Sequence, residues 1–161
     1  MKKAFLTIVA AVVFCLSSFS QNIAVGIHSG WSTYIGSNTN LSVPVGVNVE
    51  WAFNAVHSIA GRTDFNIGIR KQDVSVYYVS PEYKYYLIGE TLNGFYVGGF
   101  LGFGGTTQSA YFSLGGITGY AYEFADKFNL EGNLQLGYGN FPGINQHVLH
   151  LVPTIGIRYM F

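Results

Sequence analysis

Cysteine, charge and long hydrophobic runs are all scarce in this sequence. The one cysteine, Cys15, lies in the first twenty residues, so the rest of the chain can form no internal disulfide and offers no thiolate nucleophile. Charged residues make up 10% of the chain, against about 25% in typical globular proteins. No segment after the N-terminal region is an apolar run of the ~20 residues that a transmembrane helix needs. The composition therefore argues against an ordinary soluble domain and against a helical membrane protein.

The N-terminus has the features of a secretory signal peptide. Lys2 and Lys3 precede a short apolar segment over residues 4–16, and small residues follow at the expected cleavage point. We expect cleavage after Ser20, which gives a signal peptide over residues 1–20 and one domain over residues 21–161. An anchor helix is disfavoured because the apolar segment is too short.

Two further points concern this N-terminal region. Lipoprotein processing at Cys15 is disfavoured because Phe14 stands where a small residue is wanted. No basic patch is left once Lys2 and Lys3 are set aside, so nucleic acid is not an expected partner.

Aromatic residues and glycine are abundant, and apolar and polar residues alternate with a period of two. Aromatics make up 17% of the chain and glycine occurs 21 times. Over residues 128–138, Phe128, Leu130, Leu134, Leu136 and Tyr138 share one face, while Asn129, Glu131, Asn133 and Gln135 share the other. The same alternation recurs over residues 41–53 and 149–161. Such segments are typical of strands with one apolar and one polar face.

The alternation predicts eight strands. Their expected ranges are 22–32, 41–53, 57–70, 73–88, 94–105, 109–124, 128–140 and 147–161, each bounded to within ~2–4 residues. Only helices and closed barrels satisfy the backbone in lipid, so the fold class is all-β: a transmembrane antiparallel up-and-down β-barrel of about eight strands, after a cleaved signal peptide.

An even strand number places both termini at one end of this barrel. We expect that end to face the periplasm, with turns near residues 54–55, 89–93 and 125–127. Connections near residues 33–40, 71–73, 106–108 and 141–146 would face outward. Pro44, Pro81 and Pro153 fall inside strands; at Pro81 and Pro153 we expect a lost hydrogen bond without a slip in register.

Aromatic residues on the face opposite the charges distinguish a membrane barrel from a soluble lipocalin. Both classes have eight strands, but a lipocalin has an apolar interior and a wet exterior. Two rings of aromatics at the strand ends are expected at the two lipid–water interfaces. The predicted aromatic girdle consists of Trp31, Trp51, Phe53, Tyr85, Phe95, Tyr122, Phe124, Phe128, Tyr138 and Tyr159.

The final residues Ile155-Gly156-Ile157-Arg158-Tyr159-Met160-Phe161 resemble the C-terminal strand signal of bacterial outer-membrane proteins. Residues 80–86, followed by residues 94–98, are similar to small eight-stranded outer-membrane proteins of Gram-negative bacteria, the OmpA/OmpX-like barrel superfamily. The resemblance implies location in the cell outer membrane, contact with its lipid and lipopolysaccharide, and insertion by the barrel-assembly machinery. It also implies that Tyr159 and Phe161 are read as the assembly signal.

Nearly all charges outside the leader fall on the inward face. The predicted lumen charge network consists of Glu50, Arg62, Asp64, Glu82, Lys84, Glu123, Glu131 and Arg158, with Glu131 and Arg158 as the expected direct pair. An eight-stranded barrel is only just wide enough for side chains to fill it. Mutual ion pairing that plugs the lumen is therefore favoured over a narrow polar conduit.

Other residues suggest weaker hypotheses. Inward glycines toward the outer end could leave a water-filled cleft, or could make room for Tyr78, Phe100 and Tyr111. His28 and His150, on strands that must pair, invite a metal site, but their spacing is not a ligand motif, and we expect neither a metal nor another cofactor.

Adjacent Ser and His residues in a strand point to opposite faces, so no nucleophile–base pair is apparent. The sequence thus predicts a non-catalytic, monomeric barrel with a structural or interaction role in the cell envelope. A minimal pore or small-solute binding barrel is the alternative, and a lipid-modifying enzyme is less favoured.

Overall fold

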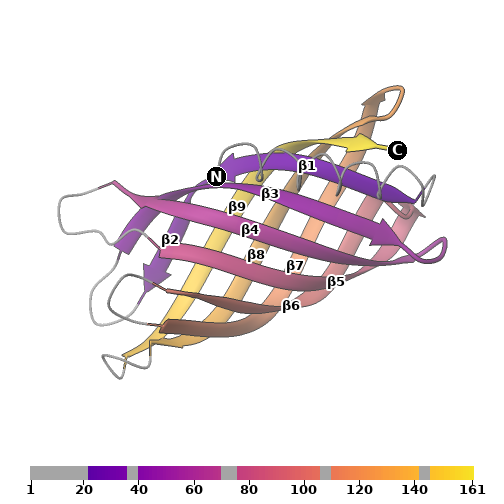
Figure 1. Cartoon of the computed structure of the whole chain (residues 1–161). Coiled ribbons are helices and arrows are strands. Elements are labelled where there is room, and N and C mark those ends of the chain that lie inside the picture. Colours follow the sequence, from indigo (N-terminus) through magenta and orange to yellow (C-terminus); the bar gives the residue numbers. More distant parts are fainter. Residues whose placement is uncertain (1–21, 36–39, 70–75, 106–109, 142–145) are drawn as a thin grey trace, which may run out of the picture.

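The computed structural model describes residues 22–35, 40–69, 76–105, 110–141 and 146–161. Its elements are antiparallel strands in the order β1 (Ile23–Gly30), β2 (Ser32–Ile35), β3 (Asn40–Ala52), β4 (His57–Gly68), β5 (Val76–Glu90), β6 (Asn93–Gly105), β7 (Ala110–Ala125), β8 (Phe128–Phe141) and β9 (Gln146–Met160). β1 and β2 both pair with β3 and β9, so they are two pieces of one strand. The sheet closes into a tilted barrel with eight strand positions (Figure 1).

This architecture confirms the prediction of an up-and-down barrel, since each strand from β3 to β9 pairs with its neighbour in sequence. Among the described residues, no helix is long and apolar enough to cross a membrane. The expected signal peptide, residues 1–20, lies outside the described residues and stays a prediction, as does the start of the fourth predicted strand (β5) at residues 73–75.

The break in the first strand was not predicted, and two prolines explain it. The register places Trp31 opposite Pro153 and Gly30 opposite Pro44. Proline has no N–H to give to a facing carbonyl, so the ladder is interrupted on both sides, although Trp31 N still donates to Pro153 O at 3.2 Å. The register is the same before and after the break. The strand therefore continues to Ile35, and the connection expected from residue 33 begins later.

At Pro81 and Pro153 the strand register does not slip, as the alternation predicted. The register of β5 against β6 is the same on both sides of Pro81 although the ladder is interrupted there, and that of β8 against β9 runs unchanged through Pro153. At the end of β5 a register shift between Tyr86 and Ile88 carries the strand on to Glu90. The turn expected over residues 89–93 is therefore reduced to Thr91 and Leu92.

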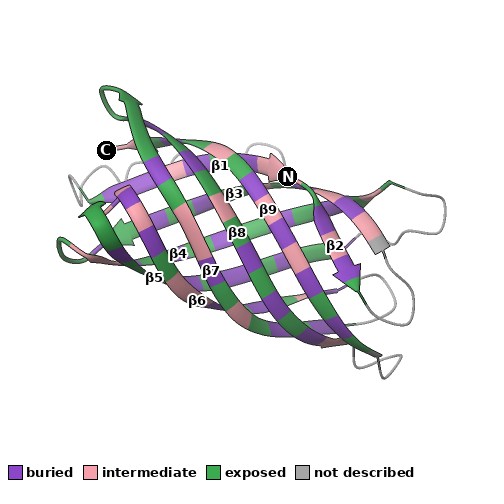
Figure 2. Ribbon diagram, turned by 180° about the vertical axis from the view of Figure 1, so that it is seen from behind, coloured by how far each residue is buried: buried purple, intermediate pink, exposed green. Residues whose placement is uncertain are grey.

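Burial follows the period of two around the whole barrel. Along β4, and along β5 as far as Tyr86, every second residue is buried and its neighbours are mostly exposed, which appears as alternating bands on the strands in Figure 2. The buried residues include charged and amide side chains, whereas the exposed ones are mostly large apolar side chains. Such a pattern is the reverse of a soluble protein and is that of a barrel in lipid.

Within the part of the chain that the structure describes, charge is found only in the lumen and at one end of the barrel. Among the described residues, the charged side chains outside the lumen are Glu90, Glu123, Asp126 and Lys127, all at or beside hairpin turns. We call this end, which carries the β3–β4, β5–β6 and β7–β8 turns and the C-terminus, the turn end. The outer wall between the two ends carries no charge within the described strands, so it can face hydrocarbon.

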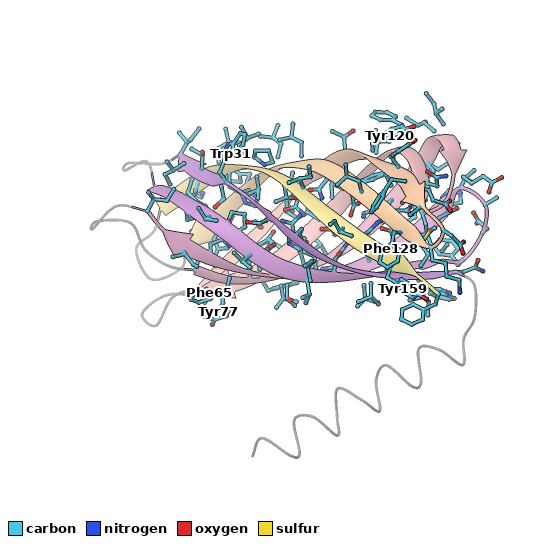
Figure 3. The ribbon with its side chains drawn as sticks, turned by 90° about the horizontal axis from the view of Figure 1, so that it is seen from above. Trp31, Phe65, Tyr77, Tyr120, Phe128 and Tyr159 are labelled. Atoms are coloured by element: carbon cyan, nitrogen blue, oxygen red, sulfur yellow. The ribbon has the colours of Figure 1, made fainter. Side chains whose placement is uncertain are left out.

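Aromatic side chains lie on the outer wall near both ends, as Figure 3 shows for Trp31, Phe65 and Tyr77 at one end and Tyr120, Phe128 and Tyr159 at the other. Of the ten predicted girdle residues, nine are exposed on the wall and Phe95 is half-buried. Near the turn end the rings of Phe124, Phe128, Tyr159 and Phe161 form a row in which each ring contacts the next. The prediction missed Phe65, Tyr83 and Tyr120, which are also exposed on the outer wall.

Candidate functional site

The lumen is the candidate site because the pleat turns polar or charged side chains of seven of the eight strand positions into it, and β6 contributes the Tyr96 hydroxyl. Its side chains form three levels along the barrel axis: a cluster of carboxylates and cations toward the turn end, an Arg–Asp–His group in the middle, and an aromatic cluster toward the opposite end.

Glu50 on β3 is the centre of the first level and is fully buried. Its Oε2 accepts from Lys84 Nζ at 2.7 Å and from Arg158 Nη1 at 2.6 Å. Its Oε1 accepts from the Ser58 hydroxyl at 2.6 Å and the Tyr86 hydroxyl at 2.7 Å. Four donors from β4, β5 and β9 thus saturate one carboxylate, which is what a buried charge requires.

Glu131 on β8 shares the same two cations. Lys84 Nζ lies 3.0 Å and Arg158 Nη1 3.4 Å from its Oε1, and the Tyr96 hydroxyl donates to that oxygen at 2.5 Å. Asn48 Nδ2 donates to Oε2 at 3.3 Å. The expected Glu131–Arg158 contact is therefore present, but Arg158 makes its shorter contact with Glu50.

Glu82 stands at the edge of this level. Gln135 Nε2 donates to its Oε1 at 2.7 Å, while Lys84 Nζ is 3.8 Å from its Oε2. Lys84 therefore lies within ion-pair distance of three carboxylates and also over the ring of Tyr96, 4.6 Å from the ring centre. Its ammonium group is the common bridge of the level.

The middle level is built around Asp64. Arg62, two residues away on the same face of β4, donates through Nε to Oδ2 at 2.6 Å and through Nη2 to Oδ1 at 3.2 Å, a bidentate contact. His28 Nε2 contacts the same Oδ1 from β1 at 2.5 Å. Arg62 Nη1 also reaches Asn133 at 3.2 Å, across the lumen on β8.

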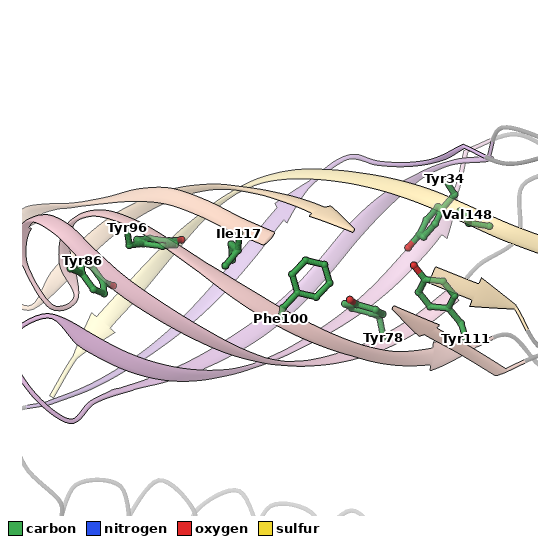
Figure 4. Close-up of a cluster of buried hydrophobic side chains, with 8 residues drawn as sticks. All are labelled: Tyr34, Tyr78, Tyr86, Tyr96, Phe100, Tyr111, Ile117 and Val148. Atoms are coloured by element: carbon green, nitrogen blue, oxygen red, sulfur yellow. The ribbon is translucent and has the colours of Figure 1, made fainter. Parts of the chain in front are cut away.

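The level toward the opposite end is aromatic, as Figure 4 shows for the cluster that includes Tyr34, Tyr78, Phe100 and Tyr111. His150 lies among these four rings, with ring centres 5.6–6.1 Å from its own. The Tyr78 hydroxyl hydrogen-bonds Ser113 at 2.9 Å. These rings lie in the part of the lumen toward which several inward glycines point.

Glycine makes room for these rings. A Cβ at Gly102 would lie 1.9 Å from the Tyr78 hydroxyl, and one at Gly137 would lie 2.0 Å from His150 Nε2. A Cβ at Gly139 would similarly approach the ring of Tyr111 to 2.4 Å. Of the two interpretations of the inward glycines, the geometry favours the one in which they accommodate aromatic side chains.

The β5–β6 turn folds over the lumen at the turn end. Leu92 has a φ of 70°, is 4% exposed, and packs in a cluster with Ala24, Ala52 and Met160. Its carbonyl accepts from Asn129 Nδ2 and, at 2.8 Å, from Arg158 Nη2. The arginine that neutralises Glu50 therefore also fixes the turn that covers the lumen.

Seven of the eight residues predicted for the lumen charge network are buried in the lumen; Glu123 is not. Glu123 has inward parity, opposite Asn129, but it is exposed. The β7–β8 hairpin projects beyond its neighbours at the turn end (Figure 1), so its last inward positions lie past the rim. The prediction that Glu123 belongs to the lumen network was wrong, because strand parity predicts which face a residue occupies and not how far the neighbouring strands extend.

The histidines of the strands have separate surroundings. Within the described ranges, no group of three or more His, Cys, Asp and Glu side chains could hold a metal ion. His28 pairs with Asp64, His150 is enclosed by rings, and His147 is exposed and stacks on Tyr138. The sequence prediction also missed Tyr86, Tyr96 and Leu92. The two tyrosines could have been found from strand parity, which Tyr86 shares with Glu82 and Lys84.

Comparison with known proteins identifies the family. Residues 5–145 match the family model described as Protein of unknown function (DUF3575). The chain belongs to this family. No curated protein matches the DUF3575 chain.

Solved structures of the same fold are small outer-membrane barrels. Neisserial surface protein A (NspA) superposes with a TM-score of 0.71 at 14% identity, covering 86% of this chain and 97% of that one. Ail, the attachment invasion locus protein of Yersinia pestis, gives 0.54 at 15% identity, covering 87% and 100%. These similarities establish the fold of the DUF3575 chain. The outer wall of its described strands is apolar and carries no charge, and its fold is that of a small outer-membrane β-barrel.

Proposed function

We propose that this protein is a non-catalytic outer-membrane barrel with a closed lumen and a structural or interaction role in the cell envelope. The observation that carries the proposal is the saturation of Glu50 by Lys84, Arg158, Ser58 and Tyr86. An ion crossing the lumen would have to displace these partners, and an uncompensated buried charge is strongly unfavourable.

Three barriers in series support the closed lumen. The Leu92 turn covers the turn end, the Glu50 and Glu131 cluster occupies the next level, and the aromatic cluster around His150 fills the far half. Eight strands leave an interior just wide enough for such side chains. The pore alternative depended on a glycine-lined cleft, and the rings occupy that space.

Single-channel recording in a planar bilayer tests the proposal. We expect the refolded barrel to give no steady openings, under conditions in which a sixteen-stranded porin conducts. The unmodified barrel is compared with a variant that combines Glu50→Ala and Lys84→Ala. This variant removes the central carboxylate and its bridging cation together. Steady, ion-selective openings of the unmodified barrel would contradict the closed lumen and revive the pore.

The interaction role is supported by the surfaces that the fold offers. A barrel with a filled lumen can act through its lipid-facing wall and its two ends. A protein of the same fold is named for attachment, which is consistent with action at an exposed end. The proposal would fail in its non-catalytic part if the purified barrel released acyl chains from lipopolysaccharide.

A further inference from the structure

The permanent charges buried in the lumen do not balance. Within the described strands four carboxylates are buried against three permanent cations, which leaves one negative charge. The carboxylates are those of Glu50, Asp64, Glu82 and Glu131, and the cations are Arg62, Lys84 and Arg158. An uncompensated charge in a dry interior is strongly unfavourable. The closed lumen therefore needs one further positive charge.

A proton is the smallest charge that makes up the difference. Within the described ranges no group of three or more His, Cys, Asp and Glu side chains could hold a metal ion. The oxygens of Glu50 and Glu131 already accept hydrogen bonds from ammonium, guanidinium, hydroxyl or amide groups. A proton on either carboxylate would displace one of these donors. The sites that are left are Glu82 and the contact between His28 and Asp64.

Glycines on both neighbouring strands make room for the contact between His28 and Asp64. The register places Gly46 of β3 directly between His28 of β1 and Asp64 of β4. A Cβ at Gly46 would lie 2.6 Å from Asp64 Oδ1 and 2.8 Å from His28 Nε2. On the other side of β1, His28 is opposite Gly156, where a Cβ would lie 2.8 Å from the His28 Cβ. The imidazole can therefore reach across one strand to the carboxylate.

The surroundings of His28 suit a proton better than those of Glu82. His28 Nε2 lies 2.5 Å from Asp64 Oδ1, so a proton on His28 places a cation beside a carboxylate. Glu82 Oε2 has the Lys84 ammonium group 3.8 Å away, so a proton on Glu82 would remove a negative charge beside a cation. Imidazole is also the side chain whose ordinary titration lies closest to neutral pH.

Two arginines complete the charged surroundings of His28. Arg62 donates to both oxygens of Asp64 from the same face of β4. Arg158 is the next inward residue after Gly156 on β9 and is turned toward Glu50, at 2.6 Å. With His28 protonated, the middle level carries one positive charge, which cancels the one negative charge of the first level. With a neutral His28, the charge of the first level is left over.

We infer that His28 binds a proton and lies in the lumen as an imidazolium paired with Asp64, and that this proton balances the charge of the closed barrel. The inference rests on the closed lumen proposed above, because water in an open lumen would screen the extra charge. It makes the stability of the barrel depend on pH, since the folded chain keeps a proton that the unfolded chain releases close to neutral pH.

Nitrogen NMR of the refolded barrel, isotope-labelled at histidine and held in nanodiscs at mildly alkaline pH, reads this proton directly. An imidazolium carries a proton on both ring nitrogens and a neutral imidazole carries one. We expect the His28 signals, identified by their loss in His28→Gln, to be those of an imidazolium, and Asp64→Asn to convert them to the neutral form. The signals of His147, which is exposed, provide the reference for a neutral ring. A neutral His28 in the unmodified barrel would overturn the inference, and so would an imidazolium that persists in Asp64→Asn.

Unfolding in urea at several pH values supplies a second measurement. The unfolding equilibrium constant of the unmodified barrel should rise about tenfold for each pH unit just above neutral, which is the slope for one released proton. His147→Gln is the matched control and should keep this slope, whereas His28→Gln should lose it. Equal slopes for the unmodified barrel and His28→Gln would overturn the inference.

These results are distinguishable from a failure of the closed lumen. A barrel that does not conduct but has a neutral His28 would overturn the inference and leave the closed lumen in place. Steady single-channel openings would contradict the closed lumen, and with it the charge balance on which the inference rests.

Discussion

Arg158 and Glu50 form an ion pair of 2.6 Å although 108 residues separate them in the sequence. They lie on β9 and β3, which flank β1. On β1 the residues between them are Ala24, opposite Glu50, and Gly26, opposite Arg158. A Cβ at Gly26 would approach Arg158 Cγ to 2.6 Å. Small residues on the first strand therefore allow its two neighbours to connect across it.

Replacing Arg158 by Ala tests the energetic weight of this pair. The change leaves Glu50 and Glu131 with Lys84 as their only cation and removes a donor from the Leu92 carbonyl. Breaking a buried ion pair costs about 3–5 kcal/mol, and we expect the free energy of unfolding in urea to fall by that order. Glu123→Ala, a charge removed at the exposed rim, should change it little. Equal effects of the two variants would remove the basis for a stabilising charge cluster.

Because inward glycines lie against aromatic rings, replacing a glycine by alanine should lower the stability of the barrel only where a ring is in the way. Gly137→Ala would place a Cβ 2.0 Å from His150 Nε2, whereas Gly61→Ala meets nothing within 4 Å. Overpacking typically costs about 1–3 kcal/mol, so Gly137→Ala should lower stability by that amount. Denaturation followed by tryptophan fluorescence compares the two variants. If Gly137→Ala were as stable as Gly61→Ala, the far half of the lumen would not be filled by rings.

Leu92 and Lys127 provide a matched pair for the turn that covers the lumen. Both have positive φ, 70° and 64°, but Leu92 is buried and Lys127 is exposed. Alanine at either position keeps the left-handed backbone, so only loss of packing distinguishes them. We expect Leu92→Ala to cost at least about 2 kcal/mol and Lys127→Ala to cost little. The same small loss at both sites would show that the turn does not seal the lumen.

The barrel itself could be predicted from the sequence because its signal is local. Strand parity over residues 128–138 separates Leu134 and Leu136 from Asn133 and Gln135 without reference to any other strand. The same parity places Glu50, Lys84 and Arg158 inside. The absence of charge from the wall of the described strands follows from the same parity, and the structural neighbours share this fold.

What could not be predicted depends on relations between strands. Glu123 has the parity of a lumen residue, but the rim of the neighbouring strands decides that it is exposed. The break at Trp31 needs the register that sets it opposite Pro153. The choice between an empty glycine cleft and a ring-filled one required the distances from Gly102 and Gly137 to their neighbours. Leu92 lies in a turn, where alternation carries no information.

The central claim is that alternate side chains of each strand face lipid and the lumen. Residues 134–136 on β8 test it most directly, because Leu134 and Leu136 are exposed on the wall and Gln135 is buried. With a nitroxide attached to a cysteine placed at each position in turn, molecular oxygen dissolved in the bilayer should relax the labels at 134 and 136 strongly and the label at 135 weakly. Equal relaxation at all three positions would contradict the account.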